Sequence, residues 1–329
     1  MPRTGRFALL AACLVATVAP TGACGSNDLE PIQAPAVADA SAADREPPAD
    51  AGVAPADAAS PPEDSADEAA AADASSLPCK RGVAANAAPT AALAPSLTLP
   101  GVTWWYNWAA QAPDAGAPSV EYVPMLWGGG SLNQAIPAGS KYLLGFNEPN
   151  FKSQANLTVQ QAAADWPMVE ARSGGIPIGS PGVNYCGSAS DSSQCTESAI
   201  TDPFTYLKDF FAACGGCRVD FVAVHAYVCD VTSLRGYIEG NTDAGGTTPG
   251  FLQFGRPIWV TELACDGSKS VAEQKAFMQA AVPYLESNPN VARYAWFSAK
   301  PIPNALLVNP DGSLTDLGST YVSLPASCH

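Results

Sequence analysis

The sequence predicts an α/β fold: a single (β/α)8 barrel over residues 79–329, preceded by a disordered linker. Three observations predict it: eight short apolar runs recur along the domain, helix-forming stretches separate them, and the composition changes abruptly near residue 79. Continuous apolar runs are typical of parallel strands buried on both faces, and their alternation with helices favours a closed barrel. The eight predicted strands are 81–85, 103–107, 122–126, 142–147, 176–180, 220–225, 257–262 and 292–297.

The first 23 residues predict a lipoprotein-type signal peptide. Arg3 and Arg6 precede an apolar run at 7–19 that is too short to span a bilayer as a stable helix. Three small residues then lead to Cys24, the residue that becomes lipidated in bacterial lipoproteins. The alternative is simple cleavage and release, with Cys24 an incidental thiol. The protein is therefore expected to be exported, either held on the cell envelope by a lipid anchor alone or secreted.

The next segment, 24–78, is predicted to be a disordered linker. Ala, Asp, Pro, Ser and Glu dominate it, and residues 25–78 contain no aromatic residue, whereas all seven Trp lie between Trp104 and Trp296. So few apolar side chains cannot bury enough surface to offset the entropy of folding. The net charge of −15 is concentrated here, with twelve acids and one base in 25–78. Like charges should keep the linker extended.

Helix start signals separate several of the predicted strands. A capping box, in which Thr or Ser stands three residues before Gln or Glu, occurs at Thr158 and again at Ser270. Pro167 and Pro283 predict kinks or early ends, because proline removes a helical hydrogen bond. Residues 230–255 are rich in Gly and Thr and are expected to form a long loop. The predicted helices are 159–172, 203–214 and 270–285.

Eight cysteines remain in the domain, an even number that in an exported protein predicts four disulfides. Eight cysteines allow 105 pairings, but the predicted barrel suggests one set. The alternative, a metal site at Cys214-Gly-Gly-Cys217, lacks a second close pair of cysteines, and the chain has only two His. No metal is expected. The suggested pairs are Cys186–Cys195, Cys214–Cys217, Cys229–Cys265 and Cys79–Cys328.

The carboxyl ends of the predicted strands hold two carboxylates and a set of aromatic and polar side chains. Barrel enzymes carry their reactive groups at these ends. Glu148 follows the fourth predicted strand and Glu262 ends the seventh. Two carboxylates across a cleft can cleave a glycosidic bond, and flat aromatic rings pack against sugar faces. A lone Glu here is usually a solvated loop residue and a lone Trp usually a core residue, so only their combination indicates a site. The candidate substrate-binding residues are Asn107, Trp108, Trp127, Asn147, His225, Tyr227 and Trp296.

The order and spacing of these motifs resemble glycoside hydrolase family 128, the endo-β-1,3-glucanases of fungi and bacteria. The similarity runs through most of 80–321, although no single motif is specific by itself. Ala85 and Ala226 depart from the pattern, since family members often carry an aromatic residue there. The matching segments are Lys80-Arg81-Gly82, Trp105-Tyr106-Asn107-Trp108, Val123-Pro124-Met125-Leu126-Trp127, Leu144-Gly145-Phe146-Asn147-Glu148-Pro149-Asn150, Gly179-Ser180-Pro181, Val219-Asp220-Phe221, Pro257-Ile258-Trp259-Val260-Thr261-Glu262 and Arg293-Tyr294-Ala295-Trp296-Phe297.

The resemblance implies a retaining hydrolase of β-glucan, most simply β-1,3-glucan. Its mechanism needs no cofactor, and a monomer is the default expectation. Its two carboxyls are expected about 5–5.5 Å apart, and the nucleophile should have the lower pKa of the two. The implied roles are acid/base for Glu148, nucleophile for Glu262, a bond to the substrate 2-hydroxyl for Asn147, support of the nucleophile for Tyr227, support of the acid/base for His225, and sugar subsites for Trp108, Trp127 and Trp296.

The sequence also bears on four other functions: nucleic-acid binding, glycan binding without catalysis, peptidase activity and cleavage of other polysaccharides. The domain has no cluster of Lys and Arg, which argues against a nucleic-acid partner. A non-catalytic surface glycan-binding lipoprotein has no need of both Glu148 and Glu262. A Cys or Ser peptidase needs a His base beside its nucleophile, and His225 is the only plausible one. A barrel glycosidase acting on mannan, xylan or another β-glucan stays open, because linkage preference depends on loop geometry.

Overall fold

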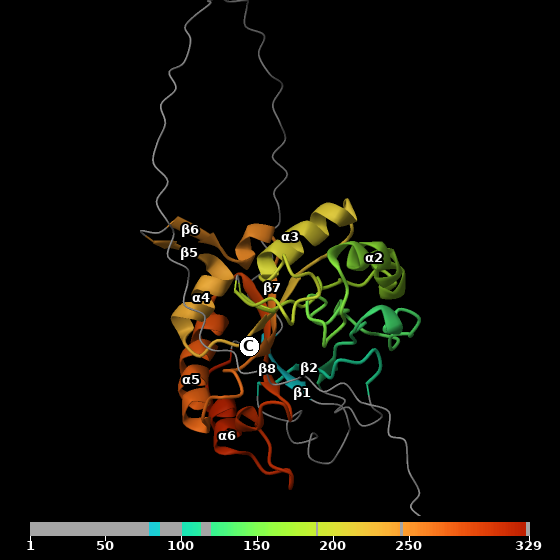
Figure 1. The fold of residues 1–329 in the computed structure, drawn as a ribbon. Helices are drawn as coiled ribbons and strands as arrows, with labels where there is room; N and C mark the ends of the chain where they lie inside the picture. The colour runs from blue at the N-terminus through green and yellow to red at the C-terminus, as the bar shows by residue number, and fades with distance from the viewer. Residues whose placement is uncertain (1–78, 86–100, 113–119, 189, 244–245, 327–329) are drawn as a thin grey trace, which may run out of the picture.

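The computed structural model describes residues 79–85, 101–112, 120–188, 190–243 and 246–326. Segments 1–23 and 24–78, and with them Cys24, lie outside the described residues. The centre of the fold is a six-stranded parallel sheet in the order β3-β2-β1-β8-β7-β4 (Figure 1), which confirms the predicted α/β class. The strands are β1 (Arg81–Ala85), β2 (Trp104–Tyr106), β3 (Glu121–Tyr122), β4 (Val222–Ala226), β7 (Ile258–Leu263) and β8 (Val291–Ser298).

Two of the eight predicted strands, 142–147 and 176–180, form single parallel bridges instead of ladders. Proline explains the short pairing, because Pro124, Pro177 and Pro181 stand in or beside these runs and have no N–H to donate. The eight-stranded closed barrel therefore stays a prediction. The bridges join Met125 to Leu144, Leu143 to Ile178, and Gly179 to Phe221, the residue before β4.

The sheet is strongly curved. Arg293 on β8 makes two hydrogen bonds, of 3.0 and 2.9 Å, to the carboxylate of Glu121 on β3, although β1 and β2 lie between these strands. The ring of Tyr142 lies 4.8 Å from that of Trp259 on β7. Side chains of strands that are not neighbours can meet this way only across the concave face of a bent sheet.

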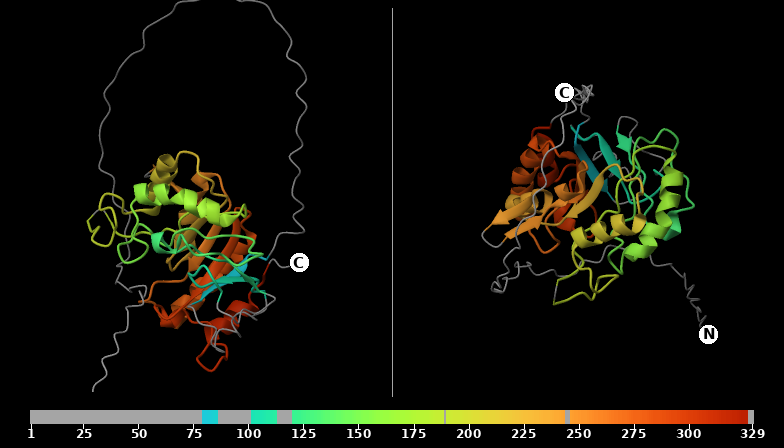
Figure 2. Two further views of the ribbon diagram at one scale, coloured as in Figure 1. Left: turned by 90° about the vertical axis from the view of Figure 1, so that its right-hand side faces the viewer. Right: turned by 90° about the horizontal axis from the view of Figure 1, so that it is seen from above.

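Helices lie outside the sheet on two sides (Figures 1 and 2). Helices α4, α5 and α6 lie along one side, and α2 and α3 pack together on the other. The predicted capping boxes are both present, with Thr158 and Ser270 accepting hydrogen bonds from the third residue of their helices. The helices are α2 (Val159–Ser173), α3 (Pro203–Cys214), α4 (Val231–Glu239), α5 (Val271–Ser287) and α6 (Asp316–Ser323), with short 3-10 turns at η2 (Gly129–Ser131), η3 (Phe251–Phe254) and η4 (Pro303–Ala305).

Of the kinks or early ends predicted at Pro167 and Pro283, the early ends do not occur. α2 continues through Pro167 and α5 through Pro283. An internal proline costs a helix about 3 kcal/mol. Each helix offsets this by burying one face, including Trp166 beside the first proline and Val282 beside the second.

The predicted long loop at 230–255 is also wrong. It contains α4, the antiparallel pair β5 (Gly240–Asp243) and β6 (Gly246–Pro249), and η3. Asp230 caps α4, because its carboxylate accepts a 2.8 Å hydrogen bond from the Ser233 N–H. Leu234 and Ile238, four residues apart, are buried on one face of the helix. The Gly and Thr content of the segment concealed this short amphipathic helix.

Three of the suggested disulfides are present: Cys186–Cys195, Cys214–Cys217 and Cys229–Cys265. Cys79 is also disulfide-bonded, and its suggested partner, Cys328, lies outside the described residues. Such bridges are typical of exported proteins. In the part of the chain that the structure describes, no helix combines the length and the apolar character needed to cross a membrane.

Candidate active site

Glu148 and Glu262 come together at the carboxyl ends of the strands, on either side of a histidine. Nδ1 of His225, on β4, lies 2.9 Å from Oε1 of Glu148 and 3.3 Å from Oε2 of Glu262. This nitrogen and one oxygen of each carboxylate all lie within 4.8 Å of one another. The three residues are buried, with exposed fractions of 7% for Glu148, 2% for Glu262 and 0% for His225.

A bulge between β4 and β7 sets this arrangement. The register runs from Val224 opposite Val260 to His225 opposite Glu262, so that Thr261 is the extra residue. The hydroxyl of Thr261 donates to the Val224 carbonyl at 3.2 Å, which fixes the bulge. Bulges re-aim side chains, and here the bulge directs Glu262 and His225 toward each other.

Backbone strain accompanies the site. Glu148 has a φ of +40° and Trp108 a φ of +62°, a region that non-glycine residues rarely adopt. Such strain costs on the order of 1–3 kcal/mol per residue and persists only where the surroundings hold it. At Glu148 the holding contacts are hydrogen bonds from its own N–H to the Gly182 carbonyl, at 2.7 Å, and from the Asn147 N–H to the Trp127 carbonyl, at 2.9 Å.

The carboxylate of Glu262 accepts hydrogen bonds from three further side chains. Trp108 Nε1 donates to Oε1 at 2.7 Å, and the Tyr106 hydroxyl approaches the same oxygen at 3.3 Å. The Tyr227 hydroxyl donates to Oε2. These donors come from β2, the turn after it and the segment after β4, so the site depends on several separate elements.

Burial and charge shift the two central groups. Burial raises the pKa of Glu262, and the Glu148 charge adds to the rise, while His225, Tyr227 and Trp108 oppose it. Complete burial thus outweighs the donors around this carboxyl. Burial lowers the pKa of His225, but the charges of Glu262 and Glu148 and the hydrogen bond to Glu148 raise it overall.

The polar residues beside the carboxylates differ in what they contact. Asn147 donates from Nδ2 to Gln154 Oε1 at 3.2 Å, and its Oδ1 is buried without a hydrogen-bond partner among the described residues. The amide oxygen of Asn107 accepts instead from the Tyr122 hydroxyl and the Ala109 N–H. The amide oxygen of Asn107 thus joins its own turn to β3.

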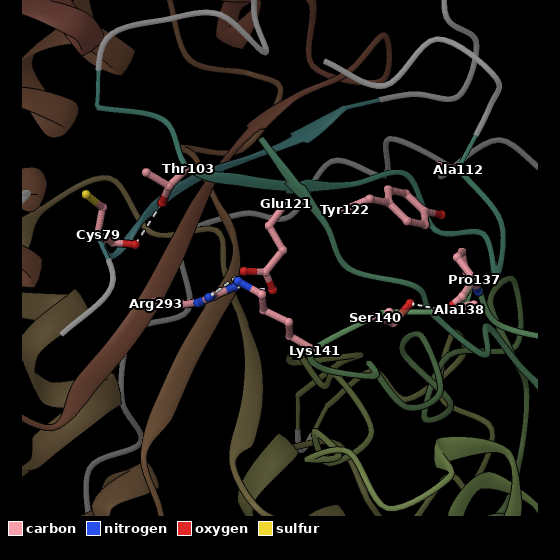
Figure 3. A pocket seen from close by; sticks show the side chains of 11 residues that line it. Cys79, Thr103, Ala112, Glu121, Tyr122, Pro137, Ala138, Ser140, Lys141 and Arg293 are labelled. Atoms are coloured by element: carbon pink, nitrogen blue, oxygen red, sulfur yellow. Dashed lines mark hydrogen bonds and ion pairs between the residues drawn. The ribbon is translucent and has the colours of Figure 1, made fainter. Parts of the chain in front are cut away.

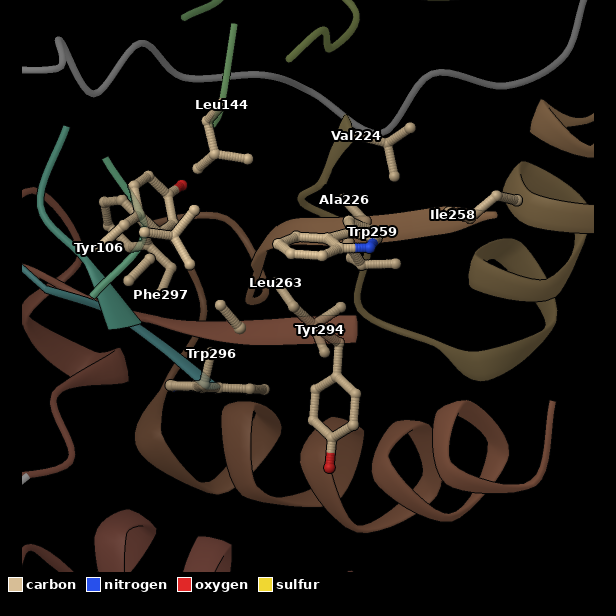
Figure 4. Packing of buried hydrophobic residues seen from close by; sticks show 14 of the residues in the cluster. Tyr106, Leu144, Val224, Ala226, Ile258, Trp259, Leu263, Tyr294, Trp296 and Phe297 are labelled. Atoms are coloured by element: carbon tan, nitrogen blue, oxygen red, sulfur yellow. The ribbon is translucent and has the colours of Figure 1, made fainter. Parts of the chain in front are cut away.

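The structure corrects the place of one predicted aromatic residue. Trp296 is fully buried on the outer face of β8, where its Nε1 donates to the Ala305 carbonyl at 2.9 Å. Figure 4 shows Trp296 on the side of β8 that faces the helices. Its ring packs near Phe277 of α5 and Tyr321 of α6. The assignment of Trp296 to a sugar subsite is wrong, because alternate side chains of a strand point to opposite faces.

Phe297, the next residue, faces the site instead. Its ring centroid lies 5.6 Å from that of Trp108 and 5.6 Å from that of Tyr227. Trp127 is half-buried at the end of the third predicted strand, where the Asn147 N–H bonds its carbonyl. Neither Phe297 nor Tyr106 was among the residues predicted for the site. Strand alternation is the signal that could have found both of them.

Comparisons with known proteins agree with this geometry. A family model described as "Glycosyl hydrolase catalytic core" matches residues 82–321. A GH128 (subgroup II) endo-β-1,3-glucanase from Sorangium cellulosum is 41% identical, with a TM-score of 0.63, and the match covers 76% of this chain and 100% of that one. The chain belongs to glycoside hydrolase family 128. This GH128 protein is accordingly a glycoside hydrolase.

Two further proteins are similar to this chain. A GH128 (subgroup I) endo-β-1,3-glucanase from Amycolatopsis mediterranei, solved with laminarihexaose, is 30% identical, with a TM-score of 0.59. That match covers 75% of this chain and 99% of the other. The Schizosaccharomyces pombe "Alkali-sensitive linkage protein 1" is 29% identical over 268 residues, 76% of this GH128 chain. The match spans less than half of that yeast protein, 45% of its length.

Residues of the types that bind metal ions also lie close together in this GH128 site. Glu148, His225 and Glu262 are the one such group in the described part of the chain. Their facing atoms already bond one another, and Trp108 and Tyr227 occupy the oxygens of Glu262. A separate cavity of about 570 Å³ lies at the opposite, amino-terminal ends of the strands (Figure 3). Neither Glu148 nor Glu262 lines it. Its lining includes Thr103, Glu121, Tyr122, Lys141 and Arg293.

Proposed function

We propose that this chain is a retaining hydrolase of β-1,3-glucan, with Glu148 as acid/base and Glu262 as nucleophile. The observation that carries the proposal is the pair of buried carboxylates whose facing oxygens lie within 4.8 Å of each other. Retaining enzymes hold their carboxyl groups about 5–5.5 Å apart, whereas inverting enzymes leave roughly 6.5–9.5 Å for a water molecule. The short separation supports retention.

The reaction takes place in two steps. Glu262 attacks the anomeric carbon while Glu148 gives its proton to the glycosidic oxygen, so the old C–O bond breaks and a glycosyl ester forms. Glu148, now a carboxylate, then takes a proton from water as the water oxygen attacks the same carbon. The ester bond breaks, and Glu262 is released as a carboxylate. Two inversions give net retention.

The surrounding donors suit these two steps. Trp108, Tyr106 and Tyr227 orient the attacking carboxylate, and they offset part of the cost of burying its charge. His225 lies between the two acids, within 3.3 Å of both. It can therefore stabilise whichever of them is ionised, Glu262 before the first step and Glu148 after it.

The substrate and the setting of the domain follow from the relatives and the sequence. The GH128 relatives above are named endo-β-1,3-glucanases, and one is solved with laminarihexaose. Trp108, Trp127 and Tyr227 offer rings that suit pyranose faces. The single bridges that connect the segment after β3 to the residue before β4 support a closed (β/α)8 barrel. The disulfides support export, with 1–23 as signal, Cys24 as lipid anchor, 24–78 as linker and 79–329 as the catalytic domain.

The deciding experiment combines Glu262→Ala with azide. Removing the nucleophile should reduce laminarin hydrolysis at least a thousandfold, on the order seen when a covalent nucleophile is lost. Azide should restore turnover and give a glycosyl azide of inverted anomeric configuration. Glu148→Ala should instead be rescued to a product of retained configuration on a substrate with an activated leaving group. Glu273→Gln, at an exposed position, is the matched control. Wild-type turnover by Glu262→Ala would reject the assignment.

A related specificity stays open because of Ala85 and Ala226. Both are buried, and their methyl groups offer none of the aromatic surface that family members often carry at these positions. A shorter grip on the glucan could shift the preferred linkage. Product analysis on laminarin, pustulan, cellulose and lichenan separates these cases. Turnover confined to pustulan or cellulose would move the substrate away from β-1,3-glucan, and binding without turnover on all four would favour a glycan-binding protein.

A further inference from the structure

The turn that carries Trp108 is held from outside the active site. Trp108 donates the 2.7 Å hydrogen bond to Glu262, yet its φ of +62° is unfavourable for a bulky residue. Its ring packs on Tyr106 and Phe297, with centroids 5.3 and 5.6 Å away. Ring packing orients the indole but does not fix the backbone, so the residues on either side of Trp108 must hold the turn.

One hydroxyl, with a single proton to share, lies within hydrogen-bond distance of both of those neighbouring residues. Tyr122 Oη lies 2.7 Å from Asn107 Oδ1 and 2.6 Å from the Ala109 carbonyl. The Ala109 N–H also donates to Asn107 Oδ1 at 3.2 Å, and the Met125 N–H to the Ala109 carbonyl at 2.9 Å. The residues before and after Trp108 are thus tied to β3 and the segment that follows it.

Tyr122 itself stands apart from the chemistry. It is on β3, lines the cavity at the amino-terminal ends of the strands (Figure 3), and packs its ring 5.0 Å from that of Trp105. Neither carboxylate is among its hydrogen-bond partners. Burial raises the pKa of Tyr122, so its hydroxyl stays protonated and remains a donor over the whole working pH range.

We propose that Tyr122 is a positioning residue that holds the Asn107–Ala109 turn and so keeps Trp108 bonded to Glu262. The inference rests on the proposed function, in which Glu262 attacks as a carboxylate. The groups facing Glu262 are Tyr106 and Trp108 from the β2 side, His225 and Tyr227 from the β4 side, and Glu148. Trp108 and Tyr227 are donors that lower the pKa of Glu262. Loss of the Trp108 bond should therefore raise it.

The test is Tyr122→Phe in the full-length protein. The variant keeps the ring that packs on Trp105 and removes only the hydroxyl. We expect kcat on laminarin to fall about tenfold with KM within twofold, since small misplacements of a reacting group lower the rate strongly. The acidic limb of the kcat/KM profile should move up by about half a pH unit, because Glu262 needs to ionise with one donor displaced.

A double-mutant cycle shows whether the effect passes through Trp108. Trp108→Phe should itself raise the acidic limb, and adding Tyr122→Phe should then change the profile no further. Tyr206→Phe is the control, because it removes a buried hydroxyl that bonds the Leu157 carbonyl at 2.9 Å. It should lower the melting temperature and leave the limb in place.

Two results would overturn the inference: an unmoved acidic limb in folded Tyr122→Phe, or fully additive effects with Trp108→Phe. If Tyr122→Phe does not fold, Asn107→Ala removes the acceptor of the same hydroxyl and should show the same limb shift; an unmoved limb in that variant also rejects the inference. Failure of the proposed function is seen separately, as retained turnover in Glu262→Ala.

Discussion

At the scale of single residues, Glu262 combines deep burial with an unusually dense set of donors. Trp108 and Tyr227 donate to its carboxylate, the Tyr106 hydroxyl lies 3.3 Å from it, and His225 lies beside it. Burial still dominates and raises its pKa. The residue therefore has to ionise in surroundings that favour its neutral form, which costs the folded state stability in exchange for a poised nucleophile.

That cost can be measured with Glu262→Gln. A carboxyl with a higher pKa in the folded than in the unfolded state loses stability as the pH rises from the unfolded value through the folded one. The neutral amide of the variant avoids this loss, so we expect its melting temperature at pH 7 to exceed that of the wild type by about 2–4 °C. The gain should vanish below about pH 4, where the wild-type carboxyl is protonated in both states.

Calorimetric melting from about pH 3 to pH 8 checks this prediction. Glu273→Gln is the control, because Glu273 is exposed and Gln preserves its capping bond to the Ser270 N–H. A Glu262→Gln variant that is less stable than the wild type at pH 7 would show that the donors outweigh burial.

At the scale of elements, strand alternation decides which aromatic residues can reach a sugar. Trp296 faces α5 and α6, whereas Phe297 faces Trp108 and Tyr227. Trp296→Phe should therefore lower the free energy of unfolding by about 1–3 kcal/mol through lost core volume and leave KM unchanged. Phe297→Leu should raise KM for laminarin severalfold with a smaller loss of stability.

Urea unfolding and steady-state kinetics on both variants test this pair. Each serves as the control for the other, since the two side chains are adjacent in one strand. A rise in KM for Trp296→Phe, with Phe297→Leu unaffected, would return Trp296 to the substrate side.

The local sequence pattern predicted some helices and strands correctly and missed others, and each outcome has a physical reason. The spans 81–85, 159–172 and 203–214 follow from apolar runs and caps that act locally, and the structure places strands or helices there. The run 176–180 pairs at single bridges because proline shortens its ladder. The helix α4 was missed because its signal, Asp230 and two apolar residues, is short and lies among Gly and Thr.

At the scale of the whole molecule, parallel strands explain why distant residues converge. The ends of parallel strands share one edge of a sheet, so the sequence could predict that Glu148, His225, Tyr227 and Glu262 lie together. The contact from Tyr122 to the turn beside Trp108 could not be predicted, because it depends on the relative placement of two neighbouring strands and a strained backbone. Such contacts follow from packing and leave no local sequence pattern.

The disulfide Cys229–Cys265 is the covalent counterpart of this convergence. Cys229 stands two residues after Tyr227, and Cys265 three residues after Glu262, so the bridge ties together the segments that carry the bonded pair. Its sequence separation is 36 residues, against 3 for Cys214–Cys217 at the end of α3. On chain entropy alone, removing the first bridge should cost about 4 kcal/mol and removing the second about 2 kcal/mol.

The activity should separate the two bridges more sharply than the stability does. Cys229→Ser with Cys265→Ser should lower kcat and move the acidic limb of kcat/KM upward, because Tyr227 then holds Glu262 less firmly. Cys214→Ser with Cys217→Ser, the matched control, should lower the melting temperature modestly and leave both kinetic values in place. Assays on laminarin at a temperature where both variants are folded make the comparison. Equal kinetic profiles for the two pairs would mean that the 229–265 bridge contributes stability only, and that the sheet itself sets the distance between Tyr227 and Glu262.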